Sequence, residues 1–170
     1  MYNYTTFLSK KQAEAFHDPS GKEGRVLISL TTPGDPNDPR PHSAYCKPAV
    51  LHDDTWKAVL RLEFHDKDPN HIDEDEACGY KLFTEADAVT ILNFLKEHEA
   101  DVDSLIVHCE GGISRSAGVA KFVAHLYSLK FNETYSVYNK HVFSTLMRTY
   151  GSSLYGDGPL AAETLPGAIA

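Results

Sequence analysis

The sequence predicts an α/β domain with a central, largely parallel sheet flanked by helices. Short apolar runs rich in β-forming residues alternate along the chain with longer segments of helical periodicity. This alternation is typical of parallel strands joined by helical crossovers. The 170 residues fit one compact domain. We therefore expect a single domain over residues 1–150 and a frayed Gly/Pro/Ala-rich tail over residues 151–170.

Three apolar runs of strand length supply the predicted sheet. Residues 25–31 (RVLISLT) form a continuous apolar run, and residues 58–64 (AVLRLEF) resemble it. Residues 104–108 (SLIVH) form a third, shorter run. Between the first two runs, residues 33–48 contain five prolines, which predicts a loop there.

Helix signals occur in four places. Ser9 is a suitable N-cap for the first helix. Thr84 and Asp87 resemble a capping box, with aspartate in place of the usual Glu or Gln. The helix that Thr84 opens has an apolar face made of Ala88, Ile91, Leu92 and Leu95. The expected helices cover residues 9–16, a segment from residue 84 onward, residues 116–129 and residues 137–150.

Composition excludes several classes of function. The net charge of −8 disfavours a nucleic-acid partner, since an acidic chain repels a phosphate backbone. No apolar run reaches the roughly 18 residues of a membrane span, and the N-terminus lacks the pattern of a signal peptide. We therefore expect a cytoplasmic protein with no membrane partner.

The three cysteines, Cys46, Cys78 and Cys109, are widely spaced and form no CxxC pair. This disfavours both a zinc site and a disulfide framework. The nine histidines show no ligand spacing of a zinc motif. The run from Asp66 to Asn70 fails as a calcium loop, because its sixth and twelfth positions lack Gly and Glu. We expect no metal and no cofactor.

The most informative segment is His108-Cys-Glu-Gly-Gly-Ile-Ser-Arg-Ser116. A cysteine ends a predicted strand, a short loop with two glycines follows, and an arginine precedes the next helix. Inward-facing amides of such a loop, together with the helix N-terminus, form a nest for an anion. Arg115 adds a planar fork that can hold two phosphate oxygens. The same positive surroundings favour the thiolate of Cys109, which is the nucleophilic form.

His108-Cys109, five residues and Arg115-Ser116 resemble the signature loop of the cysteine-based protein tyrosine phosphatases. The chain length resembles the dual-specificity subgroup, and the loop is similar to that of small bacterial and phage-type members, HCE-x-G-I-S-R-S. The resemblance covers about residues 25–150, and the loop is its specific part. It implies a phosphatase-like sheet flanked by helices, with Ser116 bonding the thiolate and His108 orienting the loop. The implied phosphate-binding residues are Glu110, Gly111, Gly112, Ile113, Ser114 and Arg115.

Ester cleavage also needs a proton for the leaving oxygen. In the resembling families this proton comes from an aspartate in a loop after the strand that precedes the central helix. Asp66 is the first candidate here and Asp68 the second, while Asp73 and Asp75 match the sequence distance found in dual-specificity members.

The sequence thus predicts a phosphatase that forms a cysteinyl-phosphate at Cys109. Its expected substrate is a phosphoprotein or phosphopeptide, because the loop holds no lysine, whereas the phosphoinositide phosphatases of the resembling superfamily tend to carry basic residues there. Phosphotyrosine is favoured, and phosphoserine and phosphothreonine stay open because the sequence shows no phosphotyrosine-stacking loop like that of the larger tyrosine-specific enzymes. The alternatives are a sulfurtransferase, an arsenate reductase or a non-catalytic phosphate-binding module. A protective disulfide between Cys109 and either Cys46 or Cys78 under oxidation is also open.

Overall fold

The computed structural model describes residues 1–34, 46–72 and 79–154. The expectations for Asp73, Asp75, Cys78 and residues 155–170 fall outside these ranges. In chain order the elements are β1 (Tyr4–Ser9), α1 (Lys10–Ala15), the 3₁₀ helix η1 (Pro19–Gly24), β2 (Arg25–Thr31), β3 (Ala58–Glu63), the 3₁₀ helix η3 (Pro69–His71), α3 (Glu85–His98), β4 (Ser104–Cys109), α4 (Arg115–Leu126) and α5 (Lys140–Leu154).

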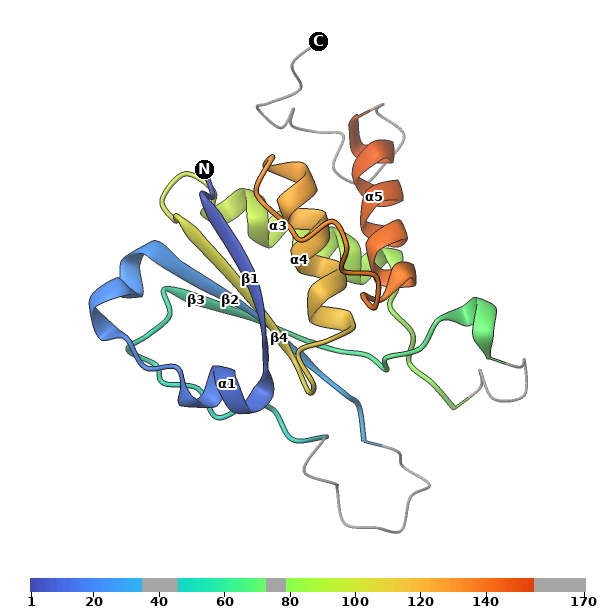
Figure 1. The fold of residues 1–170 in the computed structure, drawn as a ribbon, viewed down its shortest axis with the longest axis horizontal. Coiled ribbons are helices and arrows are strands. Elements are labelled where there is room, and N and C mark those ends of the chain that lie inside the picture. Colours follow the sequence, from blue (N-terminus) through green and yellow to red (C-terminus); the bar gives the residue numbers. More distant parts are fainter. Residues whose placement is uncertain (35–45, 73–78, 155–170) are drawn as a thin grey trace.

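The expected α/β architecture is confirmed. Within the described residues, four parallel strands form one sheet in the order β1-β4-β2-β3 (Figure 1). Because all four strands run the same way, their carboxyl ends meet at one edge of the sheet. The segments that follow Ser9, Thr31, Glu63 and Cys109 therefore lie along this edge, which we call the carboxyl edge.

Alternate residues of the central strands face two different layers. Val26, Ile28 and Leu30 of β2 pack into the main core with α3, α4 and α5, which cover one face of the sheet (Figure 1). Leu27 and Ile106 point to the other face, where a smaller core includes Trp56. This period of two places neighbouring residues of β4 on opposite faces. Cys109 belongs to the main core, and His108 is directed away from it.

The apolar runs predict three of these strands closely, and the expected apolar face of α3 is buried. β1 is missing from the prediction. Its sequence, YTTFLS, is half polar because it is an edge strand that pairs only with β4 among the described residues. Ser9 and the Thr84–Asp87 pair form capping boxes, as the sequence indicates.

Two helices have different ends from those expected. α4 stops at Leu126, not at residue 129, because Ser128 adopts a φ of 55° and the amide of Leu129 donates to the carbonyl of Ala124. This is a Schellman ending with serine in place of glycine. α5 begins at Lys140 and continues to Leu154, so residues 151–154 are helical and not part of a tail. No helix in the described ranges is long and apolar enough to span a membrane.

Candidate active site

The candidate site lies at the carboxyl edge of the sheet, where residues 110–114 connect β4 to α4. Cys109 is the last residue of β4 and Arg115 is the first of α4. Both are buried, with 2% and 3% of their surface exposed. The end of a strand and the start of a helix therefore fix the two side chains that the sequence singles out.

Gly112 allows this loop to pack against the start of the chain. Its φ is +64°, in the left-handed region that residues with a Cβ disfavour. A Cβ at this position would also overlap the backbone of Leu8 and Ser9. The amide of Lys10 donates to the carbonyl of Glu110 at 3.2 Å. The junction of β1 and α1 thus supports one side of the loop.

The N-terminus of α4 is left without a side-chain cap. Ser114 occupies the N-cap position, yet its hydroxyl does not bond a helix amide. It donates instead to Oδ1 of Asp66 at 2.7 Å. The first amides of a helix have no partner inside the helix, so an uncapped N-terminus keeps them available to an anion.

Ser116 lies beside the cysteine. Its Oγ is 3.1 Å from Sγ of Cys109, and the serine is fully buried. A hydroxyl at this distance donates a hydrogen bond to a thiolate. The contact matches the role that the family resemblance implies for Ser116.

Arg115 is held by two hydrogen bonds and retains an unused donor. Nη1 donates to the carbonyl of Phe64 at 2.6 Å, and Nη2 donates to the Thr32 hydroxyl at 2.9 Å. The buried Nε has no hydrogen-bond partner among the described residues and lies 4.0 Å from Oδ2 of Asp66. A buried cation with an unsatisfied donor is costly unless an acceptor binds there. The geometry favours an anion at Nε.

The structure brings Asp66, and not Asp68, beside Arg115. Besides Ser114, the side-chain amide of Asn139 donates to Oδ1 of Asp66 at 2.8 Å. Asp68 instead caps η3 and accepts a hydrogen bond from the Asn70 amide, which is the main reason that the pKa of Asp68 is lowered. Of the candidate aspartates that lie in the described residues, Asp66 is therefore the one that lies beside Arg115.

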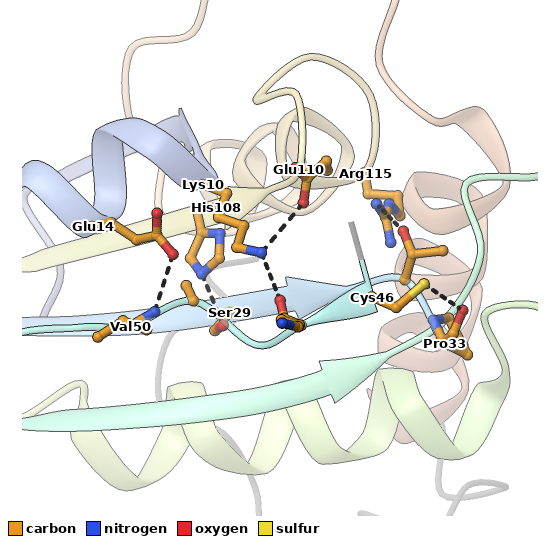
Figure 2. A network of polar contacts seen from close by, with 12 residues as sticks. Lys10, Glu14, Ser29, Pro33, Cys46, Val50, His108, Glu110 and Arg115 are labelled. Atoms are coloured by element: carbon orange, nitrogen blue, oxygen red, sulfur yellow. Dashed lines mark hydrogen bonds and ion pairs between the residues drawn. The ribbon is translucent and has the colours of Figure 1, made fainter. Parts of the chain in front are cut away.

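His108 supports the sheet beneath the loop. It is 1% exposed, and its Nε2 lies 2.8 Å from the hydroxyl of Ser29 on β2 (Figure 2). Burial lowers the pKa of His108 to about 4, so the ring is neutral near pH 7. A neutral ring bonded to a neighbouring strand agrees with the expected positioning role.

This burial predicts an acid-sensitive fold. A histidine in the unfolded chain titrates near pH 6.5, so between about pH 6.5 and 4 the unfolded state binds a proton that the folded state does not. Stability is therefore lost as the pH falls through this range, by about 3 kcal/mol from His108 alone. Urea unfolding at about pH 6.5 and at about pH 4 measures this loss in the free energy of unfolding. The loss should be smaller for His108→Asn than for the wild type. Equal acid sensitivity of the two proteins would contradict this assignment.

Sequence reasoning missed Tyr135. Its hydroxyl donates to the carbonyl of Ile113 at 2.7 Å, and its ring packs on Phe7 with centroids 5.2 Å apart. Burial, and after it the charge of Cys109, raise the pKa of Tyr135. Tyr135 thus braces the outer part of the loop. No local motif marks it, because its partners lie in other parts of the chain.

Sequence reasoning also missed Lys10. The loop itself contains no lysine, but Lys10 of α1 brings an ammonium group next to it. Its Nζ lies 3.9 Å from Oε2 of Glu110 and donates to the carbonyl of Lys47 at 2.7 Å (Figure 2). This pair offsets the negative charge that Glu110 brings close to an anion site. Sequence reasoning also missed Thr32, which bonds Arg115, and Asn139, which bonds Asp66. Of these two, only Asn139 has a local signal, because asparagine is a common N-cap residue and it directly precedes α5.

The described residues thus gather a buried cysteine, a hydroxyl bonded to it, a buried arginine and a carboxylate at one end of a parallel sheet. Comparisons of the chain with models of protein families, with curated proteins and with solved structures gave no match.

Proposed function

We propose that this protein is a cysteine-dependent phosphatase with a protein tyrosine phosphatase-like fold. The observation that carries the proposal is the buried Arg115, whose Nε makes no hydrogen bond to any described residue and lies 4.0 Å from Asp66, and whose neighbour Ser116 bonds Cys109. Together with the uncapped N-terminus of α4, these residues supply an anion site, a nucleophile and an acid. The HCx₅RS loop between β4 and α4 supports the family assignment.

The proposed reaction has two steps. In the first, the Cys109 thiolate attacks phosphorus, an S–P bond forms and the P–O ester bond breaks. Asp66 gives its proton to the leaving oxygen. In the second, Asp66 accepts a proton from water as the water oxygen attacks phosphorus, and the S–P bond breaks. Ser116 stabilises the departing thiolate with its hydrogen bond.

Preformed donors stabilise the transition state. The proposed donors to the equatorial phosphate oxygens are the amides of residues 110–115, Nε of Arg115, and the second N–H on each Nη. Phe64 and Thr32 hold the guanidinium in place before substrate binds, so little reorganisation is needed. No metal or organic cofactor takes part in this scheme.

The proposed substrate is a phosphoprotein or phosphopeptide, with phosphotyrosine favoured. Lys10 lies near the loop but is already paired with Glu110, and the net charge is −8. Both features disfavour polyanionic substrates such as inositol lipids and nucleic acids. Ile113 is 54% exposed on the loop and offers an apolar contact to a phenol ring.

The test is hydrolysis of p-nitrophenyl phosphate by the wild type under reducing conditions with a chelator present. We expect turnover that chelation does not affect. Peptides of one sequence carrying phosphotyrosine, phosphoserine or phosphothreonine then rank the substrates. No turnover of any of these would contradict the proposal, and assays of sulfur transfer, arsenate reduction and phosphopeptide binding would then distinguish the alternatives.

The assignment of the acid predicts different effects for two neighbouring aspartates. Asp66→Asn should lower kcat for phenyl phosphate by about 10²-fold, since general acid catalysis contributes about 10²–10⁴-fold. The loss should be smaller for p-nitrophenyl phosphate, whose leaving group needs less protonation. Asp68→Asn is the matched control and should stay within about twofold of the wild type. A larger effect at Asp68 would transfer the role to that residue.

Asn139 should act as a positioning residue with two separable roles. Its Nδ2 donates to Asp66, while its Oδ1 accepts from the amide of Val142 and caps α5. Asn139→Ser keeps a cap and Asn139→Ala does not, so only the alanine variant should lose about 1 kcal/mol of stability. Both variants lose the donor to Asp66 and should lower kcat for phenyl phosphate about fivefold. Full activity of the serine variant would separate Asn139 from catalysis.

A further inference from the structure

Three potential metal ligands meet on the surface away from the candidate active site. His17 follows α1, and His52 and Asp54 lie in the segment before β3; all three are exposed. One ligand atom from each lies within 4.8 Å of the other two. Nε2 of His17 is 3.1 Å from Oδ2 of Asp54, and the two imidazole rings stack with centroids 4.4 Å apart.

Buried neighbours hold these three residues in place. Phe16, next to His17, packs on Trp56 with ring centroids 5.3 Å apart, and Trp56 is 3% exposed. Thr55, next to Asp54, is fully buried, and its hydroxyl accepts a hydrogen bond from the Asp18 amide at 3.3 Å. The backbone on both sides of the cluster is thus fixed, and only exposed side chains need to move.

The cluster lies at the amino edge of the sheet. Lys57 donates its amide to the carbonyl of Arg25, the first residue of β2, at 2.9 Å. Cys109 ends the adjacent strand at the opposite, carboxyl edge. A metal at His17 would therefore play no direct part in the proposed reaction at Cys109.

We propose that His17, His52 and Asp54 bind a zinc ion. Two imidazole nitrogens and one carboxylate oxygen match the three protein ligands of open zinc sites, with water as the fourth ligand. Tetrahedral bonds of about 2.0–2.2 Å place the ligand atoms about 3.4 Å apart. Nε2 of His17 and Oδ2 of Asp54 are already 3.1 Å apart, and the other pairs, which lie within 4.8 Å, can reach this separation by rotation of exposed side chains. Zinc would take the place of the hydrogen bond between Nε2 of His17 and Oδ2 of Asp54.

The electrostatic setting favours a cation. The chain carries a net charge of −8, so the overall field attracts cations. Sequence patterns did not single out this cluster, because its residues come from two segments far apart in the chain and have no motif spacing.

Bound zinc would cross-link the end of α1 to the segment that leads into β3. This segment already meets α1 at two further points, where Lys10 donates to the carbonyl of Lys47 and Glu14 accepts from the amide of Val50 (Figure 2). Zinc would add a third contact, at the C-terminal end of α1. Because the metal binds the folded chain, it should raise the temperature of unfolding.

The test is zinc binding by equilibrium dialysis and thermal unfolding, with Cys109→Ser as the parent so that the loop thiolate does not bind the metal. We expect one zinc site that His17→Ala or His52→Ala weakens at least about tenfold, since loss of even an outer-shell partner costs about 10–100-fold. His125→Ala, at an exposed histidine of α4, should bind as the parent does. Zinc at about 100 times its Kd should raise Tm of the parent by about 5–10 °C.

At the same zinc concentration the two histidine variants should show at most about half of this shift in Tm, because a tenfold weaker site is only about ten times above its own Kd. Asp54→Asn should also reduce the shift. Zinc affinity and Tm shift that are equal in the parent and both histidine variants would overturn the proposal. So would the absence of zinc binding and of a Tm shift in the parent. None of these readouts depends on phosphatase activity, so the zinc site and the proposed function fail independently.

Discussion

Replacement of Cys109 by serine should lower kcat for p-nitrophenyl phosphate by at least about 10⁴-fold. A serine hydroxyl stays protonated at neutral pH, whereas the proposed reaction needs an anionic nucleophile. The side chain is 2% exposed and the replacement is nearly the same size, so the fold should persist. Steady-state kinetics measures the loss, and thermal unfolding shows that the variant remains folded.

Cys46→Ser is the matched control for this experiment. Cys46 is partly buried, and its thiol bonds the carbonyl of Pro33, a contact that a hydroxyl can replace (Figure 2). We expect kcat within about twofold of the wild type. Activity of Cys109→Ser above a few per cent of the wild type would remove the cysteine from the mechanism.

Arg115→Lys should lower kcat by about 10³-fold. Lysine keeps the charge but loses the planar fork, so it cannot bond Phe64, Thr32 and the phosphate at once. Loss of one transition-state donor costs about 10²–10³-fold, and loss of an arginine in phosphoryl transfer about 10³–10⁵-fold. The effect should fall mainly on kcat if the fork acts in the transition state.

Arg148→Lys, at an exposed position of α5, controls for a general effect of the substitution and should leave kcat unchanged. Arg115→Lys should also lose about 1–3 kcal/mol of stability, because the carbonyl of Phe64 loses its donor. Chemical unfolding separates this loss from the kinetic effect. A kcat of Arg115→Lys within about tenfold of the wild type would contradict the role of the fork.

Local sequence patterns predicted the parts of the site that lie within one stretch of chain. The apolar run before Cys109 and the helix after Arg115 place the loop correctly at the carboxyl edge of the sheet. β1 escaped prediction because an edge strand does not need a continuous apolar run. Its backbone at Leu8 and Ser9 nevertheless explains why position 112 is a glycine.

The remainder of the site depends on contacts between distant segments. The sequence offered Asp66 first as the acid, then Asp68, with Asp73 and Asp75 as further candidates. Of the two that lie in the described residues, Asn139 and Ser114 bond only Asp66, and neither contact has a local signature. Thr32 likewise reaches Arg115 only because β2 and β4 are neighbours in the sheet.

The most direct test of the central claim is to trap the phosphate on the chain. Asp66→Asn is mixed with p-nitrophenyl phosphate, quenched in acid and analysed by peptide mass spectrometry. The good leaving group departs without an acid, while hydrolysis of the intermediate lacks its base, so phosphate should accumulate on the peptide that contains Cys109. Turnover with phosphate on another residue, or with no phosphorylated peptide at any quench time, would contradict a cysteinyl-phosphate mechanism.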